Sequence, residues 1–376
     1  MGSAALRELA RRGLRVLGLE RFHIGHDRGS SHGETRIIRK AYFEHPDYVP
    51  LLRRAYELWQ ELEQEAGEKL FHRTGLLEIG RPDGVVIPGV RRSAREHGLP
   101  VEDVPIEGVA HRFPGFSASG DMVALFEADA GYLPVERCVH VLVESARAHG
   151  ATVREGVCVQ GWTARGTDIV VQATSESLTA ARLVLCPGPW AGDLLAHFRL
   201  PLSVRRKPVF WFAARPGAYD PHRGSPVFCF DTPFGFFYGF PAVDGVSVKV
   251  AEHTGGRIIG DADSVDRTIR KEDEQPVRDF VARHLSSATT EILRNSVCLY
   301  TMTPDEHFII DRDPDHSAIA FAAGFSGHGF KFCPVVGSIL ADLVLRSTSD
   351  EPCGFLGASR PSLRGKATGP VGSVGR

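Results

Sequence analysis

The sequence has no excess of charge of either sign, no apolar run approaching the ~20 residues that cross a bilayer, and no paired-cysteine motif. Its 44 Lys and Arg side chains nearly balance 46 Asp and Glu, which leaves a net charge of −2. This balance provides no electrostatic basis for binding nucleic acid or an anionic membrane. The first residues are charged and amphipathic, without the apolar core of a secretory signal. We therefore expect neither a nucleic-acid nor a membrane partner.

The seven cysteines are scattered, odd in number and free of C-x-x-C spacing. This distribution argues against a disulfide framework and against a zinc site, so we expect no bound metal. It favours a reducing compartment, and we predict a cytoplasmic protein.

The length and the hydrophobic pattern predict two interleaved domains. At 376 residues the chain exceeds a single ordinary core. Parallel-sheet patterns at its start, middle and end are interrupted between Val204 and Tyr300 by short alternating and aromatic runs, typical of an antiparallel sheet. We predict an α/β fold, with a Rossmann-like dinucleotide-binding domain interleaved with an α+β substrate domain on a mainly antiparallel sheet. The predicted boundaries are 1–78, 132–203 and 301–359 for the first domain, 79–131 and 204–300 for the second, and 360–376 for a disordered tail.

The opening "MGSAALRELARRGLRVLGLERF" indicates a helix followed by a strand that closes on Glu20. This pattern is the second half of a dinucleotide-binding βαβ unit, where an acidic residue accepts hydrogen bonds from a ribose. An ordinary charged strand end is equally consistent with Glu20 alone.

The segment "AGFSGHGFKF" places three glycines between a predicted strand and helix: Gly324, Gly327 and Gly329. Glycines let the backbone approach a flat or anionic ligand closely, and the helix directs its positive end at that ligand. The pyrimidine edge of a flavin suits such a site, although a tight turn alone also explains the glycines. Lys331 follows directly, flanked by Phe330 and Phe332.

The strand "GVSVKVAEHT" places Lys249 and His253 on one face, roughly 13 Å apart, so both could line one pocket. In "ETRIIRKAY", Arg36 and Arg39 supply guanidinium groups of the kind that clamp a carboxylate. A solvated strand face and surface arginines are the alternative interpretations.

In "VCLYTMTPDEHFIID", Cys298 and Tyr300 share one face of a predicted strand. The cysteine is either a small core residue or a thiolate nucleophile.

Three segments in order, "GSSHGETRIIRKAY", "CLYTMTPDEHFIID" and "GFSGHGFKF", make the whole chain resemble the family of monomeric sarcosine oxidase and N-methyltryptophan oxidase, which is similar to peroxisomal sarcosine/pipecolate oxidase. The resemblance implies that the dinucleotide is FAD, attached covalently through Cys298. It implies that Arg39 and Lys331, beside Tyr300, bind the substrate carboxylate. The catalytic residues it implies are Tyr238 and His253 in the substrate cavity, Lys249 on the other flavin face for oxygen activation, and Arg36 and His32 against the ring. The cofactor-binding residues it implies, besides Cys298, are Gly2, Glu20, Arg21, Thr35, Gly327, Gly329 and Phe330.

The resemblance further implies a reaction. Sarcosine, or a related N-methyl or secondary amino acid, reacts with oxygen to give glycine or the primary amino acid, formaldehyde and hydrogen peroxide. The resemblance also implies that the protein is a monomer.

Family members begin with a strand and a G-x-G-x-x-G turn whose last glycine matches Gly2. This sequence lacks that strand and the first two glycines, so we expect a start assigned to an internal methionine. Three alternatives stay open. The substrate is N-methyltryptophan, pipecolate or a similar amino acid; the chain is a truncated family member that binds no FAD and is not catalytic; or it is an NAD-dependent dehydrogenase, which would give Cys298 no role.

Overall fold

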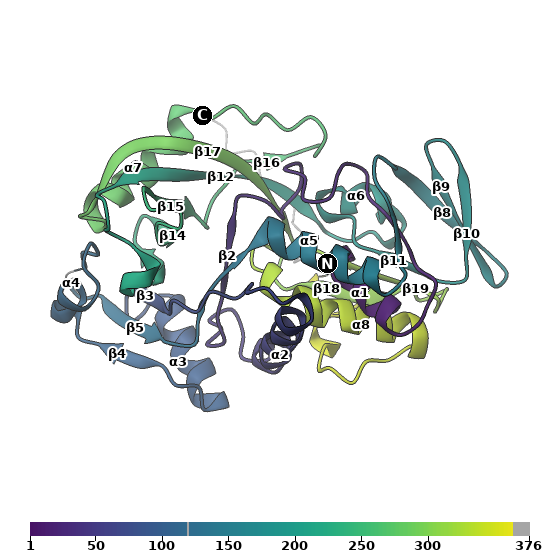
Figure 1. Ribbon diagram of the computed structural model, residues 1–376, viewed down its shortest axis with the longest axis horizontal. Coiled ribbons are helices and arrows are strands. Elements are labelled where there is room, and N and C mark those ends of the chain that lie inside the picture. Colours follow the sequence, from purple (N-terminus) through teal and green to yellow (C-terminus); the bar gives the residue numbers. More distant parts are fainter. Residues whose placement is uncertain (119, 364–376) are drawn as a thin grey trace, which may run out of the picture.

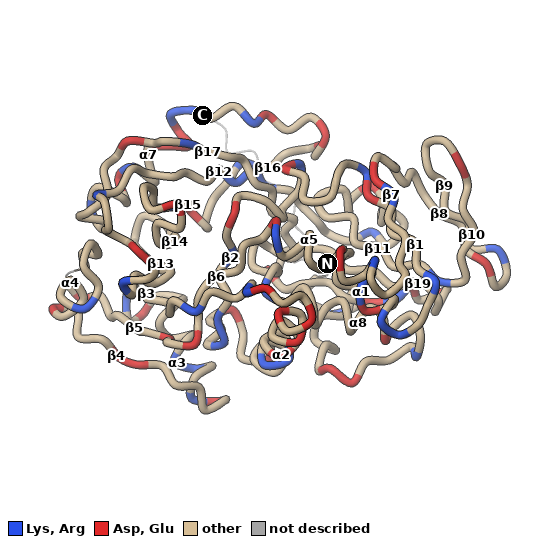
Figure 2. The backbone as a smooth tube through the Cα atoms, in the orientation of Figure 1, with Lys and Arg blue, Asp and Glu red and all other residues tan. Residues whose placement is uncertain are grey.

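The chain forms two lobes, one around a large sheet and one around the N- and C-terminal helices, which lie side by side in Figure 1. A computed structural model describes residues 1–118 and 120–363. Acidic and basic residues are interspersed over both lobes (Figure 2). Within the described residues, no helix combines the length and the apolar character that crossing a membrane requires.

The large sheet has nine strands and carries one wall of the functional site. In spatial order they are β16 (Ile258–Ile259), β12 (Ser203–Ala214), β15 (Ser247–Glu252), β14 (Gly235–Phe240), β13 (Val227–Thr232), β3 (Leu76–Gly80), β5 (Val123–Glu127) and β4 (Glu102–Val104), with β17 (Ala288–Met302) paired to β12. All pairs are antiparallel except β13 with β3. The predicted antiparallel sheet between Val204 and Tyr300 is therefore confirmed.

Alternation along the strands divides this sheet into two faces. Val248 and Val250 of β15 belong to a core that Phe280 of α7 (Lys271–His284) covers. Lys249, between them, points to the opposite face with Tyr238 and Phe240 of β14. The polar and aromatic side chains of the site therefore share one face of the sheet.

The second lobe contains parallel strand pairs and smaller sheets. β1 (Leu17–Leu19) runs parallel to β7 (Thr152–Arg154), and β11 (Leu183–Leu185) runs parallel to β19 (Ile319–Ala323). The other pairings are antiparallel: β18 (Ile309–Arg312) with β19, β8 (Val159–Arg165) with β9 (Asp168–Ala173), β9 with β10 (Ser177–Ala180), and β2 (Thr35–Ile38) with β6 (Gly131–Pro134). The mixed α/β class predicted from the sequence is confirmed.

Helices cover these strands and meet one another at small residues. The longer helices of this lobe are α1 (Gly2–Arg11), α2 (Tyr48–Ala66), α5 (Val135–Ala148) and α8 (Cys333–Arg346), and it also contains the short α6 (Ala191–Leu194). Two further helices, α3 (Val86–His97) and α4 (Val109–Arg112), lie beside the nine-stranded sheet (Figure 1). α8 contacts β11, β18, β19, α1 and α2. A Cβ atom on Gly337 would lie 2.6 Å from the backbone of Ala4, so this glycine permits the close contact of α8 with α1.

The structure refines two predicted boundaries. The predicted boundary at residue 78 falls inside β3, and all residues of this strand pair in the nine-stranded sheet. The division of the chain into two domains stays a prediction. The prediction of a disordered tail from residue 360 is wrong at its start, because Arg360 is ion-paired and Pro361–Leu363 form a 3₁₀ turn with a buried Leu363. The rest of that tail, 364–376, lies outside the described residues.

Arg360 fastens this last segment to the β18 region, and its replacement by Ala is expected to lower the free energy of unfolding by about 3 kcal/mol. Its guanidinium donates to both carboxylate oxygens of Asp305, at 2.7 and 2.9 Å, and to the backbone carbonyls of His307 and Phe308. Urea titration of Arg360→Ala beside Arg360→Lys would measure the loss, and equal stability of Arg360→Ala and the unmodified protein would contradict it.

The same ion pair predicts a pH dependence of stability. Burial alone would raise the pKa of Asp305, but Arg360 and Ser362 lower it well below its usual value. Because the pKa is lower in the folded state, the stabilisation is present above about pH 4 and is lost as the pH falls. In Arg360→Ala this loss on acidification should be smaller.

Candidate active site

A cavity of about 1320 Å³ extends from the first turn of α1 and the end of β1 to the strands β14 and β17 of the nine-stranded sheet. Pockets for small ligands usually measure ~300–1,000 Å³. The cavity therefore has room for a dinucleotide together with a small substrate.

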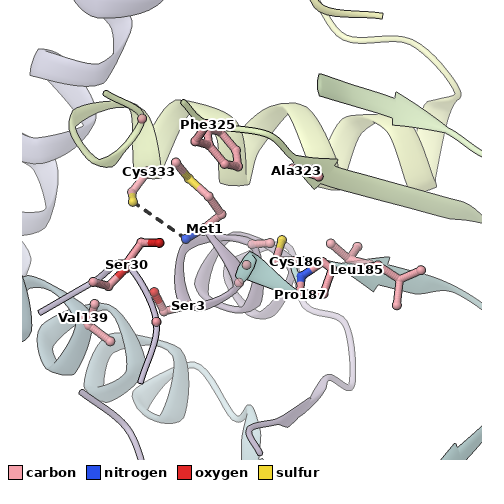
Figure 3. A pocket seen from close by; sticks show the side chains of 18 of the residues that line it. Met1, Ser3, Ser30, Val139, Leu185, Cys186, Pro187, Ala323, Phe325 and Cys333 are labelled. Carbon is pink, nitrogen blue, oxygen red and sulfur yellow. Dashed lines mark hydrogen bonds between the residues drawn. The ribbon is translucent and has the colours of Figure 1, made fainter. Parts of the chain in front are cut away.

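The end of the cavity at α1 has the features of a diphosphate and ribose site. Figure 3 shows Met1, Ser3 and Ser30 around this end, with Cys186 opposite and the Met1 amine 3.8 Å from the Cys333 sulfur. Met1, Gly2 and Ser3 all line the cavity, so the N-terminal end of a ten-residue helix is directed at it. The free N–H groups and the dipole at such an end favour an anion.

Glu20 and Arg21 lie at the same end, directly after β1. The Glu20 carboxylate accepts from the backbone N–H of Phe22 at 2.9 Å and also lines the cavity. Arg21 donates to both oxygens of Asp263, at 2.8 and 2.9 Å, and lies over the ring of Trp190. Arg21 thus organises an aromatic wall at this end and keeps its own charge balanced.

Two glycines of "GFSGHGFKF" are required by close contacts. Gly327 has a φ of +83°, and a Cβ atom there would lie 2.2 Å from the Tyr300 ring. A Cβ atom on Gly329 would lie 2.5 Å from the Phe325 ring. This turn leads through Phe330 and Lys331 into α8, so it brings backbone and a lysine to the cavity wall.

Two buried cations lie at the opposite end of the cavity. The Arg39 guanidinium donates to both oxygens of Glu44, at 2.8 and 2.6 Å, and to the carbonyl of Ala41 at 3.1 Å. The Lys331 ammonium donates to the carbonyl of His328 at 2.7 Å. Burial and the charge of Arg39 lower the pKa of Lys331 to about 7. Burial would raise the pKa of Glu44, but Arg39 and its neighbours outweigh it and lower the value to about 2.

Neutral polar groups complete this end. The hydroxyls of Tyr238 and Tyr300 lie 3.3 Å apart, and the His253 ring centroid is 5.5 Å from that of Tyr300. Burial and the nearby Lys207 lower the pKa of His253 to about 3, so its imidazole is neutral near pH 7. This end therefore combines cations for an anion with a neutral imidazole and phenols around them.

Cys298 lies in a positively charged environment next to the cavity. Its sulfur is 3.6 Å from an Arg36 nitrogen and 4.0 Å from Nδ1 of His32. Burial would raise the pKa of this thiol, but Arg36, His32 and Lys249 outweigh burial and lower it to about 6. A large fraction is thus thiolate at neutral pH, the nucleophilic form of cysteine.

The Lys249 ammonium is held by oxygen atoms of the segment before β2. It donates to the carbonyls of Gly33 and Thr35, at 2.5 and 3.0 Å, and to the Thr35 hydroxyl at 3.2 Å. Burial and the charge of Arg36 lower its pKa to about 7. Within the described residues no carboxylate lies within ion-pair distance of this ammonium.

The structure brings the predicted site residues together in two groups. Those that line the cavity are Gly2, Glu20, Arg21, Arg36, Arg39, Tyr238, His253, Tyr300, Gly327, Gly329, Phe330 and Lys331. Those that lie behind Arg36, outside the lining, are His32, Thr35, Lys249 and Cys298. Of Lys249 and His253, only His253 lines this cavity, and the Lys249 ammonium is hydrogen-bonded to oxygen atoms of residues 33 and 35.

Sequence reasoning missed three acidic residues at this site. Glu44 follows Arg39 by five residues, and an acidic side chain so close to a predicted carboxylate clamp was an available signal. Glu136, at the start of α5, accepts from the backbone N–H groups of Gly33 and Glu34 and so positions the oxygens that hold Lys249. Glu78, inside the apolar "GLLEIG", is fully buried.

These residues fit FAD. The α1 terminus and Glu20 suit the diphosphate and ribose, and the glycine turn offers backbone to a planar ring. The His32 ring supplies a further indication, because its Nε2 atom is buried and has no hydrogen-bond partner within the described residues. Those residues contain no group of three or more His, Cys, Asp or Glu that could hold a metal ion.

Solved structures of amino acid oxidoreductases share the fold. The chain superimposes on NikD, an unusual amino acid oxidase essential for nikkomycin biosynthesis, with a TM-score of 0.84 and 23% identity over 94% of each chain. Glycine oxidase from Geobacillus kaustophilus matches with a TM-score of 0.79 and 19% identity, over 96% of this chain and 95% of that chain. At these identities the likeness concerns the fold.

Curated relatives are much more similar in sequence. The chain is 39% identical to monomeric sarcosine oxidase of Streptomyces avermitilis, over 96% of this chain and 95% of the relative. It is 34% identical to N-methyl-L-tryptophan oxidase of Yersinia pestis, over 91% of each chain. Residues 1–343 match the family described as FAD dependent oxidoreductase. An NAD-dependent dehydrogenase is thereby excluded, and the chain belongs to the FAD dependent oxidoreductase family, among the relatives of monomeric sarcosine oxidase and N-methyltryptophan oxidase.

Proposed function

We propose that this protein oxidises sarcosine or a related N-methyl or secondary amino acid with FAD and oxygen. With an N-methyl substrate its products are glycine or the primary amino acid, formaldehyde and hydrogen peroxide. The observation that carries the proposal is the pair of buried cations, Arg39 and Lys331, at one end of a cavity whose other end suits a dinucleotide. The similarity to sarcosine and N-methyltryptophan oxidases supports it.

The substrate is oriented by its carboxylate. Arg39 and Lys331 bind this group, because a guanidinium fork and an ammonium together satisfy both oxygens. Tyr238, Tyr300 and the neutral His253 surround the remainder of the substrate and exclude water from it. Fixing a small substrate in this way supplies an orientation contribution to the rate.

Bound FAD supplies the redox chemistry, accepting a hydride equivalent from the N-methyl carbon and returning two electrons to oxygen. The residues that hold it are the cofactor set named above, with His32 and Arg36 against the ring. Lys249 keeps a positive charge beside the place where oxygen is reduced. A fixed cation there stabilises the negative charge that develops on oxygen.

Cys298 is the proposed covalent anchor of the flavin. Its lowered pKa and its position beside Arg36 and His32 support a nucleophilic role. Replacing Cys298 by Ser is expected to abolish attachment, since a serine hydroxyl is not ionised at neutral pH. The absorption spectrum of acid-precipitated, washed and redissolved protein measures this. The unmodified pellet should be yellow and the Cys298→Ser pellet colourless. Cys229→Ser is the matched control, and a yellow Cys298→Ser pellet would contradict the assignment.

The compartment and the assembly state are part of the proposal. All seven cysteines are free, which supports a reducing compartment, the cytoplasm. A monomer stays a prediction from the resemblance.

A substrate panel tests the proposed reaction. Purified holoenzyme is incubated in air with sarcosine, N-methyltryptophan, pipecolate and glycine, and hydrogen peroxide is measured. We expect peroxide from at least one secondary amino acid and at least tenfold less from glycine. N-methyltryptophan or pipecolate as the best substrate would select the corresponding alternative. No peroxide from any of them would favour the non-catalytic family member.

A further inference from the structure

Glu78 is a fully buried carboxyl group, and neither of its side-chain oxygens has a hydrogen-bond partner within the described residues. Glu127 on the neighbouring strand β5 is also buried, but it accepts from the backbone N–H groups of Lys40 and Ala41, at 2.7 and 3.0 Å. Buried polar groups in folded proteins almost always have a partner. The two free oxygens of Glu78 therefore call for a donor that residues 1–118 and 120–363 do not supply.

Glu78 does not line the cavity itself but lies one strand beyond a residue that does. In the sheet register it pairs with Cys229 of β13, which in turn pairs with Tyr238 of β14. Residues paired in this way project from the same face, and neighbouring strands are ~4.8 Å apart. Cys229 and Tyr238 line the cavity. Glu78 is therefore the next residue on this face of the sheet beyond Cys229.

The charged groups around Glu78 leave it as a neutral acid at pH 7. Arg39 and Glu44 face it from the segment after β2, Glu127 from β5, and Cys229 from β13. Burial raises its pKa to about 8, against the opposing charge of Arg39. The hydrogen bonds of Arg39 recorded in the structure go to Glu44 and Ala41, so none of them reaches Glu78.

We propose that Glu78 is a specificity-determining residue that binds the far end of a substrate side chain carrying an ammonium or another N–H donor. The preferred substrates are then N-methylated basic amino acids. This inference rests on the proposed function, since it takes the carboxylate to be held by Arg39 and Lys331. From the carboxylate site at Arg39 and Lys331, the side chain of the substrate passes Cys229 and Phe43, both of which line the cavity. When a cationic end arrives, Glu78 releases its proton to the buffer and forms an ion pair.

A pair of inert ligands tests this directly on the holoenzyme. Hexanoate and 6-aminohexanoate share the carboxylate and the chain, and they differ only in the terminal ammonium. We expect 6-aminohexanoate to bind at least tenfold more tightly. At pH 7 its binding should release most of one proton more than that of hexanoate, measured by calorimetry in buffers of different ionisation enthalpy. Binding of the two ligands within twofold, with equal proton release, would overturn the proposal.

Two variants assign the effect to this residue. In Glu78→Gln the preference for 6-aminohexanoate and the extra proton release should both disappear. In Glu127→Gln, a buried glutamate whose oxygens have partners, both should persist. If Glu78→Gln keeps the preference, Glu78 is not the recognition residue. If it does not fold, the proton release of the unmodified enzyme still decides.

A kinetic comparison separates this inference from the proposed function. Nα-methyllysine and Nα-methylnorleucine differ at the same terminal position, and the ratio of their kcat/KM values should favour the lysine derivative by at least tenfold. A ratio near one, with both substrates oxidised, overturns the role of Glu78 and leaves the proposed function intact. If no secondary amino acid of either panel is oxidised, the proposed function itself fails, whereas the difference in binding between 6-aminohexanoate and hexanoate still reports on Glu78.

Discussion

Replacing Lys249 by Met is expected to slow the reaction of the reduced enzyme with oxygen by about 10²–10³-fold. The Lys249 ammonium is buried and held by three oxygen atoms of Gly33 and Thr35, so its position is fixed. A preorganised cation stabilises the negative charge that oxygen acquires, and an apolar side chain of similar length removes it. Stopped-flow reoxidation of substrate-reduced enzyme measures the effect.

The control for this substitution is a second buried lysine. Lys207 lies on neighbouring β12, and its ammonium donates to the carbonyls of His253 and Thr254. We expect Lys207→Met to react with oxygen within about threefold of the unmodified enzyme, since its ammonium is bonded to the carbonyls of residues 253 and 254 and not to those of residues 33 and 35. Equal reoxidation rates of Lys249→Met and Lys207→Met would contradict the role of Lys249.

The reoxidation rate should also depend on pH. The pKa of Lys249 is lowered to about 7, chiefly by burial and by Arg36. The charged form therefore dominates below this pKa and declines above it. We expect reoxidation to be fastest on the acidic side and to slow as the pH rises through the pKa, a dependence that Lys249→Met should not show.

Replacing Arg39 by Met is expected to raise the KM for sarcosine by roughly 30-fold or more. Removing one partner of a buried, hydrogen-bonded charge pair costs about 2–5 kcal/mol, and each 1.4 kcal/mol is a factor of ten. The loss concerns binding of the carboxylate, so KM should change more than kcat. Steady-state kinetics measure both, with hexanoate inhibition as an independent readout of carboxylate binding.

The same substitution leaves Glu44 buried without its partner, which could by itself weaken the protein. The pKa of Glu44 is lowered to about 2 in the folded state, so its ion pair stabilises the fold above about pH 4.5 and less so as the pH falls. The double variant Arg39→Met with Glu44→Gln removes the unpaired charge. It should regain stability but not substrate affinity. Recovery of a normal KM in the double variant would show that Arg39 does not bind substrate.

The local sequence pattern was sufficient to predict the strands and helices and many of the residues at the candidate site. The alternation around Lys249 predicted its face of the sheet, and the strand pairing confirms the antiparallel arrangement. The glycines of "GFSGHGFKF" predict a close approach of the backbone to a ligand, which stays a prediction, whereas the contacts that require Gly327 and Gly329 in the structure are with the rings of Tyr300 and Phe325. These features depend on near neighbours in sequence, which periodicity and turn chemistry describe well.

The remaining features depend on contacts between distant segments. Lys249 is held by backbone oxygens more than 200 residues earlier in the chain. Arg360 is ordered by Asp305, although its own segment is rich in Gly, Pro and Ser. Glu78 is surrounded by apolar residues in sequence, and only the pairing of β3 with β13 brings it next to the cavity. None of these contacts follows from spacing.

The most direct test of the central claim is anaerobic addition of sarcosine to the purified holoenzyme. We predict that the visible flavin absorption is lost on mixing, that an N-methyl substrate gives one formaldehyde per flavin, and that admitting air restores the absorption with one hydrogen peroxide. If another amino acid of the substrate panel is oxidised faster than sarcosine, that amino acid is used in its place. A flavin spectrum that no secondary amino acid changes would contradict the proposed reaction, even though the fold and the family would stand.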